Sequence, residues 1–197
     1  MKVLSSIIAF SALFFSCKTE NNKPDDEALT YKYFEMENRG WKSKLQNQYV
    51  DDINFTATEV PVQYFLLQDL GPGEVSKVDS LYTLNKEERI IEFEFTHEEE
   101  KDLLSSDFTA LSYEDGIKYL SFEINKDFYI VSSKNDTIAC SGVLYERNFK
   151  VAPFQRVILF FSGVPEGDNI QLVYNDNLYR KGIIKFRFKE NISNILL

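Results

Sequence analysis

Strict alternation of apolar and polar side chains is the feature that most constrains the fold of this chain. In the hexapeptide IIEFEF at 90–95, apolar residues occupy every second position and glutamates lie between them. The hexapeptide IKFRFK at 184–189 repeats the pattern with basic residues, and residues 118–124 place Leu120 and Ile124 on one side. A period of two is typical of a strand with one face in a core and the other in water.

A continuous apolar run at 157–161, VILFF, predicts a central strand that is buried on both faces. Turn residues separate the apolar segments, as in Gly71-Pro72-Gly73 and Lys134-Asn135-Asp136. Many short strands at this spacing predict an all-β fold, an antiparallel β-sandwich of about ten strands, with a closed β-barrel as the alternative. Further strands are expected near 31–37, 48–56, 61–68, 77–84, 127–133, 137–146 and 169–175.

One short helix is expected over residues 97–106. Thr96 and Glu99 have the spacing of a capping box, and the acidic residues at 98–100 favour the positive end of a helix dipole. Leu103 and Leu104 would dock this helix on a sheet. His97 is then expected to be a solvated residue of the first helical turn.

The first residues have the pattern of a bacterial export signal. Lys2 precedes the apolar stretch 3–15, which is too short to span a bilayer as a helix, and the stretch ends at Ser16-Cys17. A small residue before a cysteine resembles the lipobox of bacterial lipoproteins, although Phe14 and Phe15 depart from its usual residues. The resemblance implies that 1–16 is a signal peptide and that Cys17 carries the lipid. A secretory signal that is cut nearby and leaves Cys17 free is the alternative.

The polar segment that follows the cysteine predicts a tether. Residues 18–28, KTENNKPDDEA, have almost no apolar side chain to bury, and fully extended they reach about 36 Å. The run at 23–27 resembles an acidic export tag of surface lipoproteins, with a plain charged linker as the alternative. We therefore expect a lipidated Cys17 and tether at 17–28, followed by a single mostly-β domain at 29–197. The expected location is the cell envelope, and the expected anchor lies in the outer membrane. Whether the domain is exposed at the cell surface is left open.

The charge of the chain argues against nucleic acid as a partner. The net charge is −9, and removal of Lys2 with the signal peptide makes the mature chain more acidic by one. An acidic surface repels phosphate backbones and anionic head groups, so the expected membrane link is the lipid on Cys17. The second cysteine, Cys140, lies in an apolar segment and is expected to be buried as a small hydrophobe.

The sequence supplies few candidates for catalysis. With His97 as the single histidine, a two-histidine metalloprotease motif is excluded, and no nucleophile elbow, P-loop or dinucleotide fingerprint occurs. Glu92 and Glu94 would share one face of a strand with Cα atoms about 6.6 Å apart, a spacing close to that of glycosidase carboxyl pairs. An amphipathic strand explains them more simply. Asn and Asp at 167–169 and 175–177 offer oxygen ligands for calcium, but such residues are ordinary in turns. We expect no catalytic residue, cofactor or metal.

Aromatic side chains are the remaining indication of a binding surface. Trp41 lies among polar neighbours and is the candidate binding residue. The favoured hypothesis is a non-catalytic binding or interaction module for an envelope protein or glycan. Alternatives are an accessory subunit of an outer-membrane assembly and a carboxylate-dependent hydrolase. A platform for sugar rings or a protein anchor would use Trp41 with the tyrosines at 119, 129, 145, 174 and 179.

Overall fold

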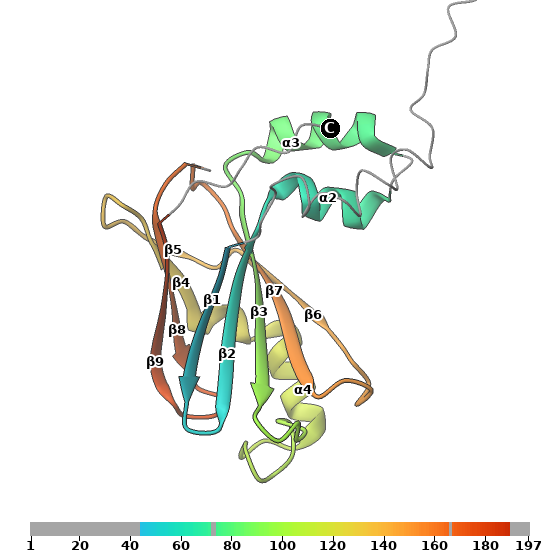
Figure 1. The fold of residues 1–197 in the computed structure, drawn as a ribbon, viewed down its shortest axis with the longest axis vertical. Helices are drawn as coiled ribbons and strands as arrows, with labels where there is room; N and C mark the ends of the chain where they lie inside the picture. The colour runs from blue at the N-terminus through green and yellow to red at the C-terminus, as the bar shows by residue number, and fades with distance from the viewer. Residues whose placement is uncertain (1–43, 72–73, 166, 190–197) are drawn as a thin grey trace, which may run out of the picture.

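The computed structural model describes residues 44–71, 74–165 and 167–189. The first strand expected from the sequence, at 31–37, lies outside them, as do the signal peptide, the tether and the start of the domain at 29. The described residues form nine strands, three α-helices and one 3₁₀ helix (Figure 1). In chain order these are β1 (Lys44–Val50), β2 (Ile53–Val60), α2 (Val62–Leu70), α3 (Val75–Asn85), β3 (Arg89–His97), α4 (Tyr113–Phe122), η2 (Ile124–Asp127), β4 (Phe128–Val131), β5 (Thr137–Ala139), β6 (Gly142–Glu146), β7 (Phe154–Phe161), β8 (Ile170–Asp176) and β9 (Gly182–Phe188).

The strands form two antiparallel sheets that pack face to face. The five-stranded sheet has the order β1-β2-β3-β7-β6, and the four-stranded sheet has the order β5-β4-β8-β9. Every paired strand among the described residues is antiparallel. The expected all-β sandwich is therefore confirmed at this level. Each sheet ends in two edge strands, so the alternative of a closed barrel is wrong.

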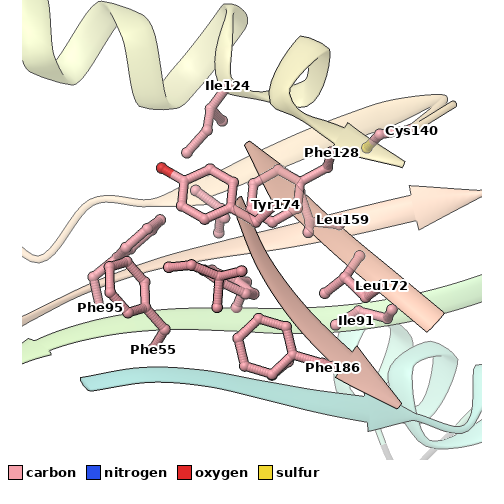
Figure 2. Packing of buried hydrophobic residues seen from close by; sticks show 14 of the residues in the cluster. Phe55, Ile91, Phe95, Ile124, Phe128, Cys140, Leu159, Leu172, Tyr174 and Phe186 are labelled. Carbon is pink, nitrogen blue, oxygen red and sulfur yellow. The ribbon is translucent and has the colours of Figure 1, made fainter. Parts of the chain in front are cut away.

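Aromatic residues from both sheets fill the core (Figure 2). Phe55 and Phe95 come from the five-stranded sheet, and Phe128, Tyr174 and Phe186 face them from the other sheet. The rings of Phe128 and Tyr174 stack with their centroids 4.4 Å apart. Each such side chain contributes roughly 1.5–3 kcal/mol when fully buried, so this core is the main source of stability.

Two segments predicted as strands form a helical hairpin instead. Residues 61–68 and 77–84 fall in α2 and α3, which project beyond one end of the five-stranded sheet (Figure 1). Gly71 ends α2 with φ of 80°, and its N–H donates to the Leu67 carbonyl. Val78, Leu81 and Tyr82 have helical spacing and are at least partly buried. The alternation in this region was too irregular to outweigh that spacing.

The third misassigned strand, at 118–124, lies in α4 and η2. Ser112 caps α4, because its side chain accepts a hydrogen bond from the Asp115 N–H. Gly116 allows close packing, since an added Cβ would lie 3.0 Å from Cδ2 of Leu104. The helix predicted at 97–106 does not form. Residue 97 still pairs with Ile53 in the sheet, and the following residues make turns.

Candidate functional site

An apolar groove lies on the outer face of the five-stranded sheet, beside the helical hairpin. It has a volume of ≈ 360 Å³. This falls within the roughly 300–1,000 Å³ range of ligand pockets. One wall is α2, and the floor is formed by β3, β7 and the start of β6. The lining residues are Val62, Phe65 and Leu66 of α2, Asn85 at the end of α3, Glu88 between α3 and β3, Ile90, Phe160, Ser141 and Gly142.

Strand register places the floor of the groove in one row. Ile90 of β3 is opposite Phe160 of β7, and Phe160 is opposite Gly142 of β6. Since neighbouring strands are about 4.8 Å apart, the three positions run side by side across the sheet. Phe65 of α2 meets the Phe160 ring edge to face, with centroids 5.5 Å apart. The row is therefore apolar at β3 and β7 and has no side chain at β6.

Gly142 keeps the β6 side of the groove open. A Cβ added there would have Cδ2 of Phe160, 3.8 Å away, as its nearest heavy atom. That distance is ordinary van der Waals contact, and the φ of Gly142 is not in the left-handed region. The position therefore tolerates a side chain sterically. The backbone conformation does not require glycine there, and the effect of the glycine is to leave space in the groove.

Few polar groups surround this apolar floor. The Ser141 hydroxyl donates to the Phe160 carbonyl over 2.8 Å, and the Ser162 hydroxyl lies 3.3 Å from the Ser141 oxygen. The Asn85 amide donates to the Leu81 carbonyl over 2.7 Å within α3. Glu88 supplies a carboxylate to the lining. The groove thus suits an apolar group with a cationic neighbour better than a group with many hydroxyls.

Charged residues occupy the outer face below the groove. Leu144 of β6 is opposite Ile158, and two residues further Glu146 is opposite Arg156. Arg156 donates from Nη2 and Nε to Oε2 of Glu94, over 2.9 and 3.2 Å, and from Nη1 to Oε2 of Glu146 over 3.3 Å. One guanidinium therefore bridges the carboxylates of β3 and β6.

Glu92 and Glu94 share the outer face, as the alternation implies, but their surroundings differ. Burial raises the pKa of Glu92, nearby Arg156 lowers it, and the carboxylates of Glu146 and Glu94 raise it further, with a net upward shift. Glu94 is paired with Arg156. Neither glutamate lines the groove. The carboxyl pair thus forms part of a charged sheet face outside the groove.

His97 is a buried residue, and its predicted solvated position is wrong. Its side chain is 4% exposed and its ring centroid lies 4.8 Å from that of Phe108. The Glu99 N–H donates to Nδ1 over 2.9 Å, so the neutral ring carries its proton on Nε2, which faces Asp52 Oδ2 at 3.3 Å. His97 therefore fixes the turn that follows β3.

The predicted aromatic platform does not assemble among the described residues. Tyr174 and Tyr179 are buried in the main core. Tyr119 and Tyr145 are partly buried against the core, and their hydroxyls donate to Asp127 and Gln155 respectively. Trp41, the proposed binding residue, and Cys17, the proposed lipidation site, both lie outside the described residues.

The loops considered for calcium have structural roles in the described part of the chain. Asp176 Oδ1 accepts from the Tyr174 hydroxyl and from the backbone of residues 178 and 179, and Oδ2 accepts from the backbone of residue 181. The Asp168 carboxylate accepts from the Ser133 N–H over 3.3 Å. Cys140 is buried as expected, at 7% exposure, and burial raises the pKa of its thiol.

Sequence reasoning missed the groove, although one signal for it was present. The run at 157–161 predicts a strand covered on both faces, and the structure confirms that Ile158 is buried on the outer face. Something had to cover that face. The cover is α2 and α3, which pack on Val60, Ile90 and Ile158. The sequence pattern predicts strands for both of these segments.

Comparisons with known proteins give no family for this chain. No family model matches it, and no curated protein matches it. Among solved structures it is similar to a protein of unknown function from Burkholderia pseudomallei K96243, with 9% identity, a TM-score of 0.35 and coverage of 83% of this chain and 84% of that one. No helix of the described residues has the length and apolar character needed to cross a membrane.

Proposed function

We propose that this chain is a lipoprotein of the cell envelope that holds a protein partner in the groove between α2 and β6. The lipobox-like residues before Cys17 support the anchor, and the tether at 18–28 gives the domain reach. The observation that carries the binding role is the groove itself, a concave apolar surface at the end of a sheet. Hollow apolar surfaces of this kind are the usual position for a ligand or partner.

A protein partner fits the groove better than a glycan does. Sugar rings require several directed hydrogen bonds as well as an aromatic face. The polar lining is limited to Asn85, Glu88 and Ser141, and two of these already donate hydrogen bonds to backbone carbonyls. Apolar side chains of a protein would instead replace water against Phe65 and Phe160. A hydrolase is less well supported, because Glu92 and Glu94 lie outside the groove.

Site-specific photo-cross-linking in native cells tests the binding role. Leu144, which is 51% exposed, borders the groove on β6 and can be replaced by p-benzoylphenylalanine. We expect irradiation to yield one discrete cross-linked protein, and we expect Gly142→Trp to abolish it by filling the groove. The matched control places the probe at Thr137, an exposed position on the edge strand β5. Equal labelling from both positions, or no product from Leu144, would overturn the proposal.

A separate measurement tests the anchor. Cells fed an alkyne analogue of palmitate should label the wild-type chain, and Cys17→Ala should remove the label and leave the precursor uncut. Cys140→Ala is the matched control, because it removes the other cysteine of the chain and should leave labelling unchanged. Labelling that survives Cys17→Ala would contradict lipidation at this residue. A cross-linked partner that also copurifies in equal amounts would identify the chain as an assembly subunit.

A further inference from the structure

The edge strand β6 forms the open border of the groove. Among the described residues β6 pairs with β7 alone, so its other edge directs backbone N–H and C=O groups away from the sheet. Val143 and Tyr145 face inward and pack against the main core. Gly142, Leu144 and Glu146 therefore form the outward row of the strand.

Natural edge strands are normally protected against pairing by proline, by lysine, by short length or by a covering segment. Strand β6 carries one charged residue, Glu146, and has α4 and η2 as neighbours. The sequence GVLYE contains no proline and no lysine. The edge strand β5 has three residues, whereas β9 carries Lys185 and Arg187 on its exposed side. The five residues of β6 thus offer an edge without proline or lysine beside an apolar groove.

We infer that the partner binds as an extended peptide segment that pairs with β6 as an added strand of this sheet. This inference rests on the proposed function and specifies the form of the partner. In strand addition, backbone hydrogen bonds supply affinity and pockets for alternate side chains supply specificity. The groove next to Gly142 is such a pocket.

The outward row of β6 defines which side chains the peptide carries. Residues directly opposite each other on paired strands have Cβ atoms about 4.5–5.5 Å apart. The peptide residue opposite Gly142 extends over the empty position towards Phe160 and is apolar. The residue opposite Leu144 meets an exposed apolar side chain and is also apolar. The residue opposite Glu146 is Lys or Arg.

Charge around the row favours a basic peptide. Glu92, Glu94 and Glu146 lie on the outer face of β3 and β6 against the single guanidinium of Arg156, and Glu88 lies in the groove. An added cation relieves the mutual repulsion of these carboxylates, which already contributes to the raised pKa of Glu92. The recognised pattern, for an antiparallel peptide, is Lys or Arg, any residue, apolar, any residue, apolar.

Selection from a random nonapeptide display library on the full-length chain in detergent micelles tests this inference. We expect enrichment of the basic and apolar pattern. A synthetic peptide from the enriched set should lose at least tenfold affinity, measured by fluorescence anisotropy, for Gly142→Trp and for Glu146→Lys. Thr137→Trp, the same bulky substitution on edge strand β5, should leave its affinity unchanged. In an added strand, only every second backbone N–H of the peptide points towards β6. Methylation of these nitrogens should abolish binding, and methylation of the intervening nitrogens should not.

The outcomes separate this inference from the proposed function. Absence of any enriched peptide, or binding that tolerates methylation of both sets of nitrogens, overturns strand addition. If strand addition fails in this way but the probe at Leu144 still cross-links a partner in cells, the groove binds a folded surface and the proposed function stands. If Leu144 also fails to cross-link, the proposed function fails as well. Enriched peptides that bind equally to Gly142→Trp overturn the assignment to this groove.

Discussion

Glu59 and Arg89 form a buried ion pair at the end of the sandwich near the helical hairpin. Their side chains are 0% and 2% exposed, and Nε of Arg89 lies 2.5 Å from Oε1 of Glu59. Nη1 of Arg89 also donates to the carbonyl oxygens of Pro165 and Asp168, over 2.8 and 3.1 Å. The pair thus connects β2 and β3 to the loop that precedes β8.

Removal of one partner from this pair should be strongly destabilising. Arg89→Met removes the guanidinium from the buried Glu59 carboxylate, although Lys44 Nζ stays 4.0 Å from its Oε2, and it takes the donor from two carbonyl groups. We expect a loss of about 3–5 kcal/mol in the free energy of unfolding. The double variant Glu59→Leu with Arg89→Met should lose less than the sum of the single changes. Urea unfolding followed by circular dichroism measures both. Arg156→Met, which breaks a partly exposed pair, is the control and should cost about 1 kcal/mol or less. Equal losses at the two arginines would contradict the burial argument.

Asp176 should be essential for the turn between β8 and β9. Its carboxylate accepts hydrogen bonds from one hydroxyl and three backbone N–H groups. Asp176→Ala leaves these buried donors unsatisfied, so we expect a loss of about 3 kcal/mol or more in stability. Asp136→Ala, which removes an equal charge from an exposed turn, should change stability by less than about 0.5 kcal/mol. A thermal unfolding series that ranks the two variants equally would refute this role.

The sequence predicted the sheets much better than it predicted the helices or the groove. Strands β3 and β9 were identified because charged side chains alternate with buried apolar ones along most of each strand. The helix at 97–106 was wrong because a local capping pattern at Thr96 competes with cross-strand pairing to Asn54, and pairing prevails. The groove depends on the register between residues 90, 142 and 160, which are distant in sequence, so no local pattern encodes it.

Stability should depend on the ionisation of Asp127. Burial raises the pKa of its carboxyl, and the nearby Asp176 raises it further, whereas the hydrogen bond from Asn177 lowers it. A raised pKa in the folded state means that the protonated form is favoured by folding. The stabilising contribution is therefore complete below the ordinary value of 3.8 and is lost as the pH rises through the folded pKa.

Asp127→Asn tests this dependence, because an amide keeps an oxygen that accepts from Asn177 and carries no charge. The amide nitrogen replaces the oxygen that accepts from the Tyr119 hydroxyl, and this loss is the same at every pH of the series. The difference in stability between Asp127→Asn and the wild type should move in favour of the variant as the pH rises from about 3 to 6, and then become constant. Urea unfolding at several pH values gives this difference. Asp115→Asn, at an exposed helix start, is the control. A difference that is flat across the same pH range would show that the ionisation of Asp127 is not linked to folding.

The tight turn between β6 and β7 stores backbone strain at an exposed aromatic residue. Phe149 and Lys150 have φ values of 50° and 63°, and the Val151 N–H donates to the Asn148 carbonyl over 2.9 Å. Two consecutive left-handed residues are typical of a type I′ turn, which favours Asn-Gly at these positions. The left-handed conformation costs a residue other than glycine roughly 1–2 kcal/mol. Phe149 is 70% exposed, so little burial offsets this cost.

Phe149→Asn combined with Lys150→Gly should therefore stabilise the fold by about 1–2 kcal/mol. Two cation–π contacts are lost, Lys150 over the Tyr113 ring at 4.1 Å and Arg147 over the Phe149 ring at 4.8 Å, and they reduce this gain. Phe122→Asn is the control. It removes a phenylalanine that is 73% exposed at the end of a helix and whose φ is not positive, so it should give no gain in stability. Chemical unfolding compares the variants directly. Destabilisation of the double variant would refute the strain. Because β6 leads into this turn, a stabilised variant that loses the Leu144 cross-link would indicate that Phe149 also contacts the partner.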